Sequence, residues 1–125
     1  MSGLNKKLEQ EVSAFQDLQR DYSKAVSSLQ QLESQLKEND LVKKEFDLLD
    51  QDAVIYKLIG PVLVKQDQGE ANVNVSKRIE FIRNEMERLE KQVKDLSEKQ
   101  EAKKLEVVKL QTAIQQAQQA QEASA

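Results

Sequence analysis

Residues 53–66 read AVIYKLIGPVLVKQ, two runs of β-branched and other apolar residues on either side of Gly60-Pro61. Such runs favour strands, and a Gly-Pro pair between them favours a tight turn, so this stretch predicts a β-hairpin. Apart from Lys57 and Lys65, both faces of the hairpin would be apolar. Because a lone hairpin is marginally stable in water and hydrophobic strand edges invite pairing, we expect other chains to cover it.

The segment before the hairpin, residues 4–50, has apolar residues that repeat every seven positions. One seam position holds Leu8, Phe15, Tyr22, Leu29 and Leu36, and the other holds Leu4, Glu11, Leu18, Ala25, Leu32 and Asn39. Alternating steps of three and four put both rows on one helix face, which predicts a coiled-coil helix. Glu11 interrupts the second row, with Val12 beside it as a substitute. Over residues 41–49 the apolar residues become denser, which indicates burial on more than one side.

The segment after the hairpin, residues 68–121, shows a more regular seam. Its two rows are Ile79, Met86, Val93, Gln100, Val107 and Ile114, and Ile82, Leu89, Leu96, Lys103, Leu110 and Ala117. Only Gln100 and Lys103 interrupt these rows, and we expect them to face the Phe15–Leu18 region. A polar seam residue fixes the register at some cost in stability, and the same break would loosen the coil. The pattern leaves both roles open.

The start of this second helix has two candidate positions. Asp67-Gln68-Gly69-Glu70 fits a capping box, which places the start near Gln68. Ser76 is the rival start, because residues 72–75 alternate like a strand, and we favour the earlier one. A reversal between two heptad helices of nearly equal length predicts an all-α dominated fold: an antiparallel two-helix coiled coil with one β-hairpin at the bend. We expect residues 1–125 to form a single domain, with the termini at one end and the hairpin at the other.

The composition argues against several classes of function. The 125 residues include no His and no Cys, which removes the usual general base, the thiol nucleophile and the common transition-metal ligands. Three isolated glycines form no phosphate-binding loop, so we predict no enzyme activity and no cofactor. A net charge of −3 without a Lys/Arg block argues against nucleic acid as a partner. No long apolar run and no apolar N-terminal signal occur, so we expect a cytoplasmic protein without membrane contact.

Two groups of apolar residues are candidate interaction sites. The hairpin group, for assembly with other chains, is Val54, Ile55, Tyr56, Leu58, Ile59, Gly60, Pro61, Val62, Leu63 and Val64. The free-end group, near the two termini, is Leu4, Leu8, Val12, Val107, Val108, Leu110 and Ile114. The alternatives are that the hairpin simply caps the coil and that the free-end group only packs in the seam. Val108 lies off the seam, which favours some exposure there.

The hairpin also carries a family resemblance. Val54-Ile55-Tyr56-Lys57-Leu58-Ile59-Gly60-Pro61-Val62-Leu63-Val64-Lys65-Gln66, followed by Lys77-Arg78-Ile79-Glu80-Phe81-Ile82, closely resembles the β-type subunits of prefoldin. The resemblance covers nearly the whole chain, from helix through hairpin to helix. Its specific part is the hairpin string, because heptads alone are common.

The resemblance implies a subunit of a hetero-hexamer of two α-type and four β-type prefoldin subunits, joined through a β-barrel of hairpins. It implies an ATP-independent chaperone whose coil tips, here the free-end group, hold unfolded proteins such as nascent actin and tubulin. It also implies delivery of these clients to the cytosolic group II chaperonin. The alternative function is a structural coiled-coil scaffold or tether, which would gain nothing from a two-faced apolar hairpin at mid-chain.

Overall fold

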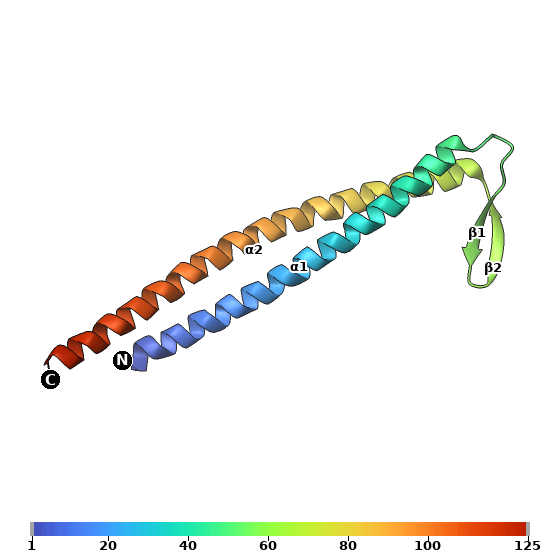
Figure 1. The fold of residues 1–125 in the computed structure, drawn as a ribbon. Coiled ribbons are helices and arrows are strands. Elements are labelled where there is room, and N and C mark those ends of the chain that lie inside the picture. The colour runs from blue at the N-terminus through green and yellow to red at the C-terminus, as the bar shows by residue number, and fades with distance from the viewer. Residues whose placement is uncertain (1, 125) are drawn as a thin grey trace. The chain divides into compact units, whose positions relative to one another are not determined.

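The computed structural model describes residues 2–124. Helix α1 spans Ser2–Leu48, strand β1 spans Ile55–Ile59, strand β2 spans Val62–Gln66, and helix α2 spans Gln68–Ser124 (Figure 1). The predicted fold class, two long helices with one antiparallel hairpin between them, is therefore confirmed. The assignment of residues 1–125 to a single domain stays a prediction.

Local hydrogen bonds mark the end of α1 and the start of α2. At the end of α1 the Leu49 N–H donates to the Phe46 carbonyl at 3.3 Å, a three-residue spacing that tightens the last turn. At the start of α2 the Glu70 N–H donates to the Asp67 carboxylate at 3.0 Å, and the Ala71 N–H donates to the Asp67 carbonyl at 2.9 Å. Asp67 is thus the N-cap residue, and α2 begins eight residues before Ser76.

The hairpin has a two-residue turn at Gly60-Pro61. Gly60 has a φ of 58°, which glycine adopts without the clash that a Cβ atom causes. The ring of Pro61 holds its φ at about −65°. Of the two-residue hairpin turns, type II′ is the one with a positive φ at the first central residue and a negative φ at the second, so it fits Gly60-Pro61. The backbone twist of a type II′ turn matches the twist of the flanking strands. The sequence therefore specifies the turn as well as the strands.

The strand register divides the hairpin side chains between two faces. The directly opposed pairs are Ile55–Gln66, Tyr56–Lys65, Lys57–Val64, Leu58–Leu63 and Ile59–Val62. Opposed residues point to the same side and successive residues alternate. One face therefore holds Ile55, Lys57, Ile59, Val62, Val64 and Gln66, and the other holds Tyr56, Leu58, Leu63 and Lys65. Apart from one lysine on each face and Gln66 at the base, these side chains are mainly apolar.

The contacts divide the chain into two compact units. The terminal unit comprises Met1–Ser27 and Glu90–Ala125, and the hairpin unit comprises Ser28–Leu89. In each unit a segment of α1 runs antiparallel to a segment of α2 (Figure 1). The buried side chains of the terminal unit are Ala25, Leu96, Leu110 and Ile114, and those of the hairpin unit are Ala71, Val75, Ile82 and Leu89. Each unit therefore has a thin apolar seam for a core.

The heptad rows correspond to the observed burial. Every predicted seam residue, the interrupting polar ones included, is buried or half-buried. The row that holds Ile82 continues toward the hairpin through Val75, seven residues earlier, and Val75 is buried. The denser apolar segment at the end of α1, residues 41–49, is not buried on more than one side as its sequence indicated. Val42 and Phe46 are half-buried there, but Leu48 is 85% exposed, because one neighbouring helix covers only one side of α1.

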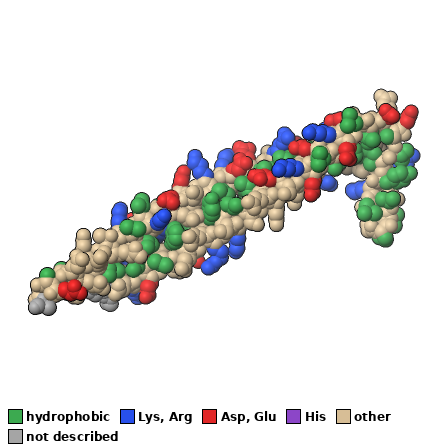
Figure 2. Space-filling view, viewed as in Figure 1, with side chains coloured by type: hydrophobic (Ala, Val, Ile, Leu, Met, Phe, Trp, Pro, Cys, Tyr) green, Lys and Arg blue, Asp and Glu red, His purple; other side chains and the backbone are tan. Residues whose placement is uncertain are grey.

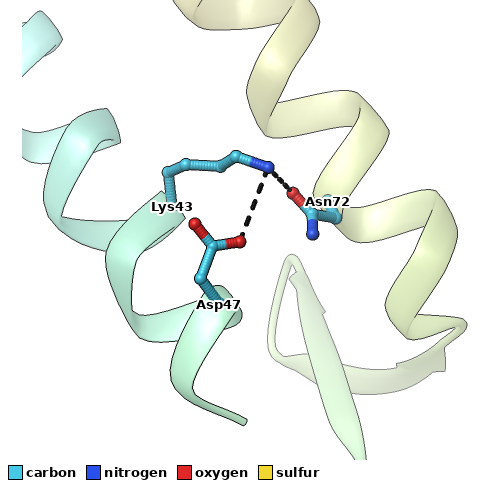
Figure 3. A network of polar contacts seen from close by, with 3 residues as sticks. All are labelled: Lys43, Asp47 and Asn72. Carbon is cyan, nitrogen blue, oxygen red and sulfur yellow. Dashed lines mark hydrogen bonds and ion pairs between the residues drawn. The ribbon is translucent and has the colours of Figure 1, made fainter. Parts of the chain in front are cut away.

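Polar side chains join the two helices of the hairpin unit. Lys43 donates to the Asn72 side-chain carbonyl of α2 and lies 3.7 Å from the Asp47 carboxylate, one turn further along α1 (Figure 3). The Arg83 guanidinium lies 3.9 Å from the Asp40 carboxylate. The Lys43–Asn72 and Asp40–Arg83 contacts join α1 to α2, whereas the Lys43–Asp47 pair lies within α1.

Candidate functional site

The hairpin exposes nearly all of its apolar side chains. Seven of them are exposed, namely Val54, Tyr56, Leu58, Ile59, Val62, Leu63 and Val64. Leu58 reaches 68% exposure, and Figure 2 shows hydrophobic side chains over much of the visible face of the hairpin. Gly60 and Pro61 at the turn are exposed as well. Ile55, at the base, is the one half-buried member of the hairpin group.

Both faces and both edges of the hairpin are open to another chain. Within residues 2–124, β1 and β2 pair only with each other, so the outer edge of each strand keeps unpaired N–H and C=O groups. Burying about half of each of seven large apolar side chains would contribute roughly 1 kcal/mol apiece, or several kcal/mol in all. The arrangement can therefore add strands at its edges and bury side chains at its faces.

The base of the hairpin is attached to the helices. Ile55 and Gln66, an opposed pair, line a groove of about 320 Å³ together with Phe46 of α1 and Val75 of α2. The Gln68 side-chain amide donates to the Asp50 carbonyl at 3.4 Å, which links the start of α2 to the loop before β1. This attachment accounts for the lower exposure of Ile55. Tyr56 and Lys57 line the same groove, whereas the hairpin residues nearer the turn do not.

The members of the free-end group differ in how far they are buried. Leu110 and Ile114 are buried, whereas Leu4, Leu8, Val12 and Val107 are half-buried. Val108 is exposed, as its position off the seam indicated. Leu105, three residues earlier on the same side of α2, is also exposed, and the sequence reasoning missed it. The signal was available, because Leu105 lies outside both seam rows.

The polar interruptions of the two seams meet in the terminal unit. The Lys103 ammonium of α2 donates to the Glu11 carboxylate of α1 at 2.7 Å. The Glu11 side chain is 21% exposed and the Lys103 side chain 35%, so solvent only partly screens this pair. The sequence marked both residues as interruptions but did not pair them. Their opposite charges were the available signal.

Within residues 2–124, the geometry shows neither a candidate metal site nor a helix that could cross a membrane. Across residues 2–124, no three Asp or Glu side chains are grouped so that they could hold a metal ion. In the same range, no helix has a stretch long and apolar enough to cross a membrane.

Comparisons with known proteins identify similar chains. The family model described as "Prefoldin subunit" matches residues 9–121. The chain is 47% identical over 115 residues to prefoldin subunit 6 of Bos taurus, which covers 92% of this chain and 89% of that protein. It is also 47% identical over 112 residues to prefoldin subunit 6 of Arabidopsis thaliana, covering 90% of this chain and 87% of that protein. The crystal structure of the prefoldin beta subunit from Thermococcus strain KS-1 matches with a TM-score of 0.74 and 25% identity, over 81% of this chain and 89% of that one.

Proposed function

We propose a function from one premise: this chain belongs to the prefoldin family and is a chaperone subunit whose partners are other prefoldin subunits. We place it as a β-type subunit in a hetero-hexamer of α-type and β-type subunits, joined through the hairpins. The observation that carries the proposal is the exposure of apolar side chains on both hairpin faces. Side chains of neighbouring subunits are the cover that such a surface requires.

In this proposal the assembled complex holds unfolded proteins without consuming ATP. Its clients include nascent actin and tubulin, which it delivers to the group II chaperonin in the cytoplasm. The support on this chain is apolar surface in the terminal unit, where Leu105 and Val108 are exposed and Leu4 and Leu8 are half-buried. Weak contacts from several subunits would add through effective concentration, so no subunit needs a tight site.

A structural scaffold or tether is the second candidate. A tether needs only the coiled coil, and it does not explain seven exposed apolar side chains on a short hairpin. Only a holding complex predicts that the assembled protein suppresses aggregation of a denatured client.

Assembly is tested by placing charge in the proposed interface. Leu58 and Leu63 are directly opposed on one hairpin face, and both become Asp in the test variant. Leu41 and Leu48 are exposed on α1 and supply a matched control with the same charge change. After reconstitution with the other prefoldin subunits, native mass spectrometry should show that the hairpin variant stays out of the complex and that the control enters it. Circular dichroism should show that both keep their helices. If the hairpin variant entered the complex, the hairpin would not form the interface, and the assembly proposal would be wrong.

Client holding is tested with the assembled complex. Light scattering during dilution of denatured actin should rise more slowly with the complex present. Removing residues 1–10 and 106–125 from this subunit should reduce that protection in part, because the other subunits remain intact. No effect of the complete complex on aggregation would reject the holding function.

A further inference from the structure

The terminal unit contains an open groove of about 510 Å³ beside its seam, within the range of roughly 300–1,000 Å³ that ligand sites occupy. Residues 14–21 of α1 and 99–106 of α2 line it, each contributing residues at positions i, i+3, i+4 and i+7. This spacing places four side chains of each helix along one flank of the coil. Ala14 and Ala102 leave room in the groove because their side chains are small, and Lys103, which also lines it, donates to Glu11.

The charged side chains that line the groove differ in whether they have an ion-pair partner. Lys103 is paired with Glu11 at 2.7 Å, and Lys99 is paired with Asp95 at 3.0 Å, so both cations already have a carboxylate. Two acidic side chains of the wall, Asp21 and Glu106, have no ion-pair partner within residues 2–124. The groove therefore combines an apolar surface with unpaired negative charge.

We infer that this groove is a subsite for extended polypeptide segments that carry a bulky apolar side chain next to Lys or Arg. The apolar side chain would lie against Leu18, Ala14 and Ala102, and the cation would approach Asp21 or Glu106. This inference rests on the proposed holding function and specifies its substrate class. An open groove leaves much of any small molecule in water, whereas an unfolded chain can engage the grooves of several subunits at once.

The test measures binding of three short fluorescent peptides to the full chain. The first carries a leucine between two arginines, the second replaces the arginines with glutamates, and the third replaces the leucine with serine. The first peptide should bind about threefold to tenfold more tightly than the other two, and its preference over the glutamate peptide should fall as salt rises. Equal affinity for all three peptides would overturn the inference.

Two variants with matched controls locate the binding. Ala102→Leu fills the groove from an exposed helical position, and it should abolish the preference for leucine over serine. Ala120→Leu, exposed on the same helix outside the groove, should not. Asp21→Asn with Glu106→Gln should remove the preference for arginine, while Glu98→Gln with Glu122→Gln, an equal charge change elsewhere on α2, should keep it. Unchanged preferences in the groove variants would refute the site.

Three further outcomes separate this inference from the alternatives. If Ala102→Leu changes self-association of the chain but not peptide affinity, the groove is a contact between copies and the inference is rejected. If the peptides bind with equal affinity while the complex still suppresses actin aggregation, the groove is rejected and the proposed function stands. If aggregation is not suppressed while the peptide preference holds, the holding function fails and the groove remains a peptide site.

Discussion

The pair formed by Glu11 and Lys103 gives the sharpest prediction about the stability of the terminal unit. Both residues occupy seam positions that other turns fill with apolar side chains, and both are half-buried. Replacing both with leucine would restore the heptad and remove two charges from a partly dry site. Replacing one alone would leave the other charge without its partner in the same place.

The magnitudes follow from the burial and the distance of the pair. Exposed ion pairs contribute about 0.2–1 kcal/mol, and breaking a fully buried one costs about 3–5 kcal/mol. With 21% and 35% of the side chains exposed and 2.7 Å between the charged atoms, this pair lies between those limits. We expect Glu11→Leu or Lys103→Leu alone to change the unfolding free energy by about 1 kcal/mol or less, as gained apolar burial offsets the unpaired charge. The double variant should gain about 1–3 kcal/mol.

The assay is urea unfolding of the full chain and its variants, followed by circular dichroism. Hydrogen exchange of the terminal unit shows whether the change is local, since stability differs between regions of one chain. The coupling energy comes from the double-mutant cycle, measured at low and at high salt because screening weakens the pair in the parent chain. A double leucine variant less stable than the parent chain would refute the reasoning, because the pair would then stabilise the seam more than apolar packing does.

Three further predictions test the hairpin, the helix start and the seam. Gly60→Ala should destabilise the hairpin by about 1–2 kcal/mol in a thermal melt, because φ is positive at that position. Gly3→Ala is the control: Gly3 lies in helical backbone with open space around it, so the change should be neutral or slightly stabilising. Asp67→Ala should cost about 0.5–2 kcal/mol through loss of the N-cap, and faster amide exchange at the start of α2 would confirm it, whereas unchanged exchange would contradict it. Leu89→Ala, at a buried seam position, should cost about 2–4 kcal/mol in urea unfolding, and Leu48→Ala at an exposed one should cost almost nothing, so equal costs would argue against the observed seam.

Local sequence information was sufficient for the elements of this fold. The period of seven predicted which face of each helix would be covered, because side chains three and four residues apart lie on the same side. Asp67 predicted the start of α2, since its carboxylate can accept a hydrogen bond from a free N–H of the first turn, that of Glu70. Gly60-Pro61 predicted the turn, because those two residues meet its backbone requirements without strain.

The tertiary structure decided what each seam residue meets. A heptad specifies a stripe, but the partner across the seam depends on the register of two helices, so the contact between Lys103 and Glu11 could not be derived from either row alone. The same dependence separates buried Leu110 and Ile114 from half-buried Leu4 and Leu8, although all four occupy predicted seam positions. It also creates the groove beside Ala14 and Ala102, because a hollow forms only where small side chains of both helices come together. Sequence thus determined the elements and their apolar faces, and the pairing of those faces determined which residues remain available to another molecule.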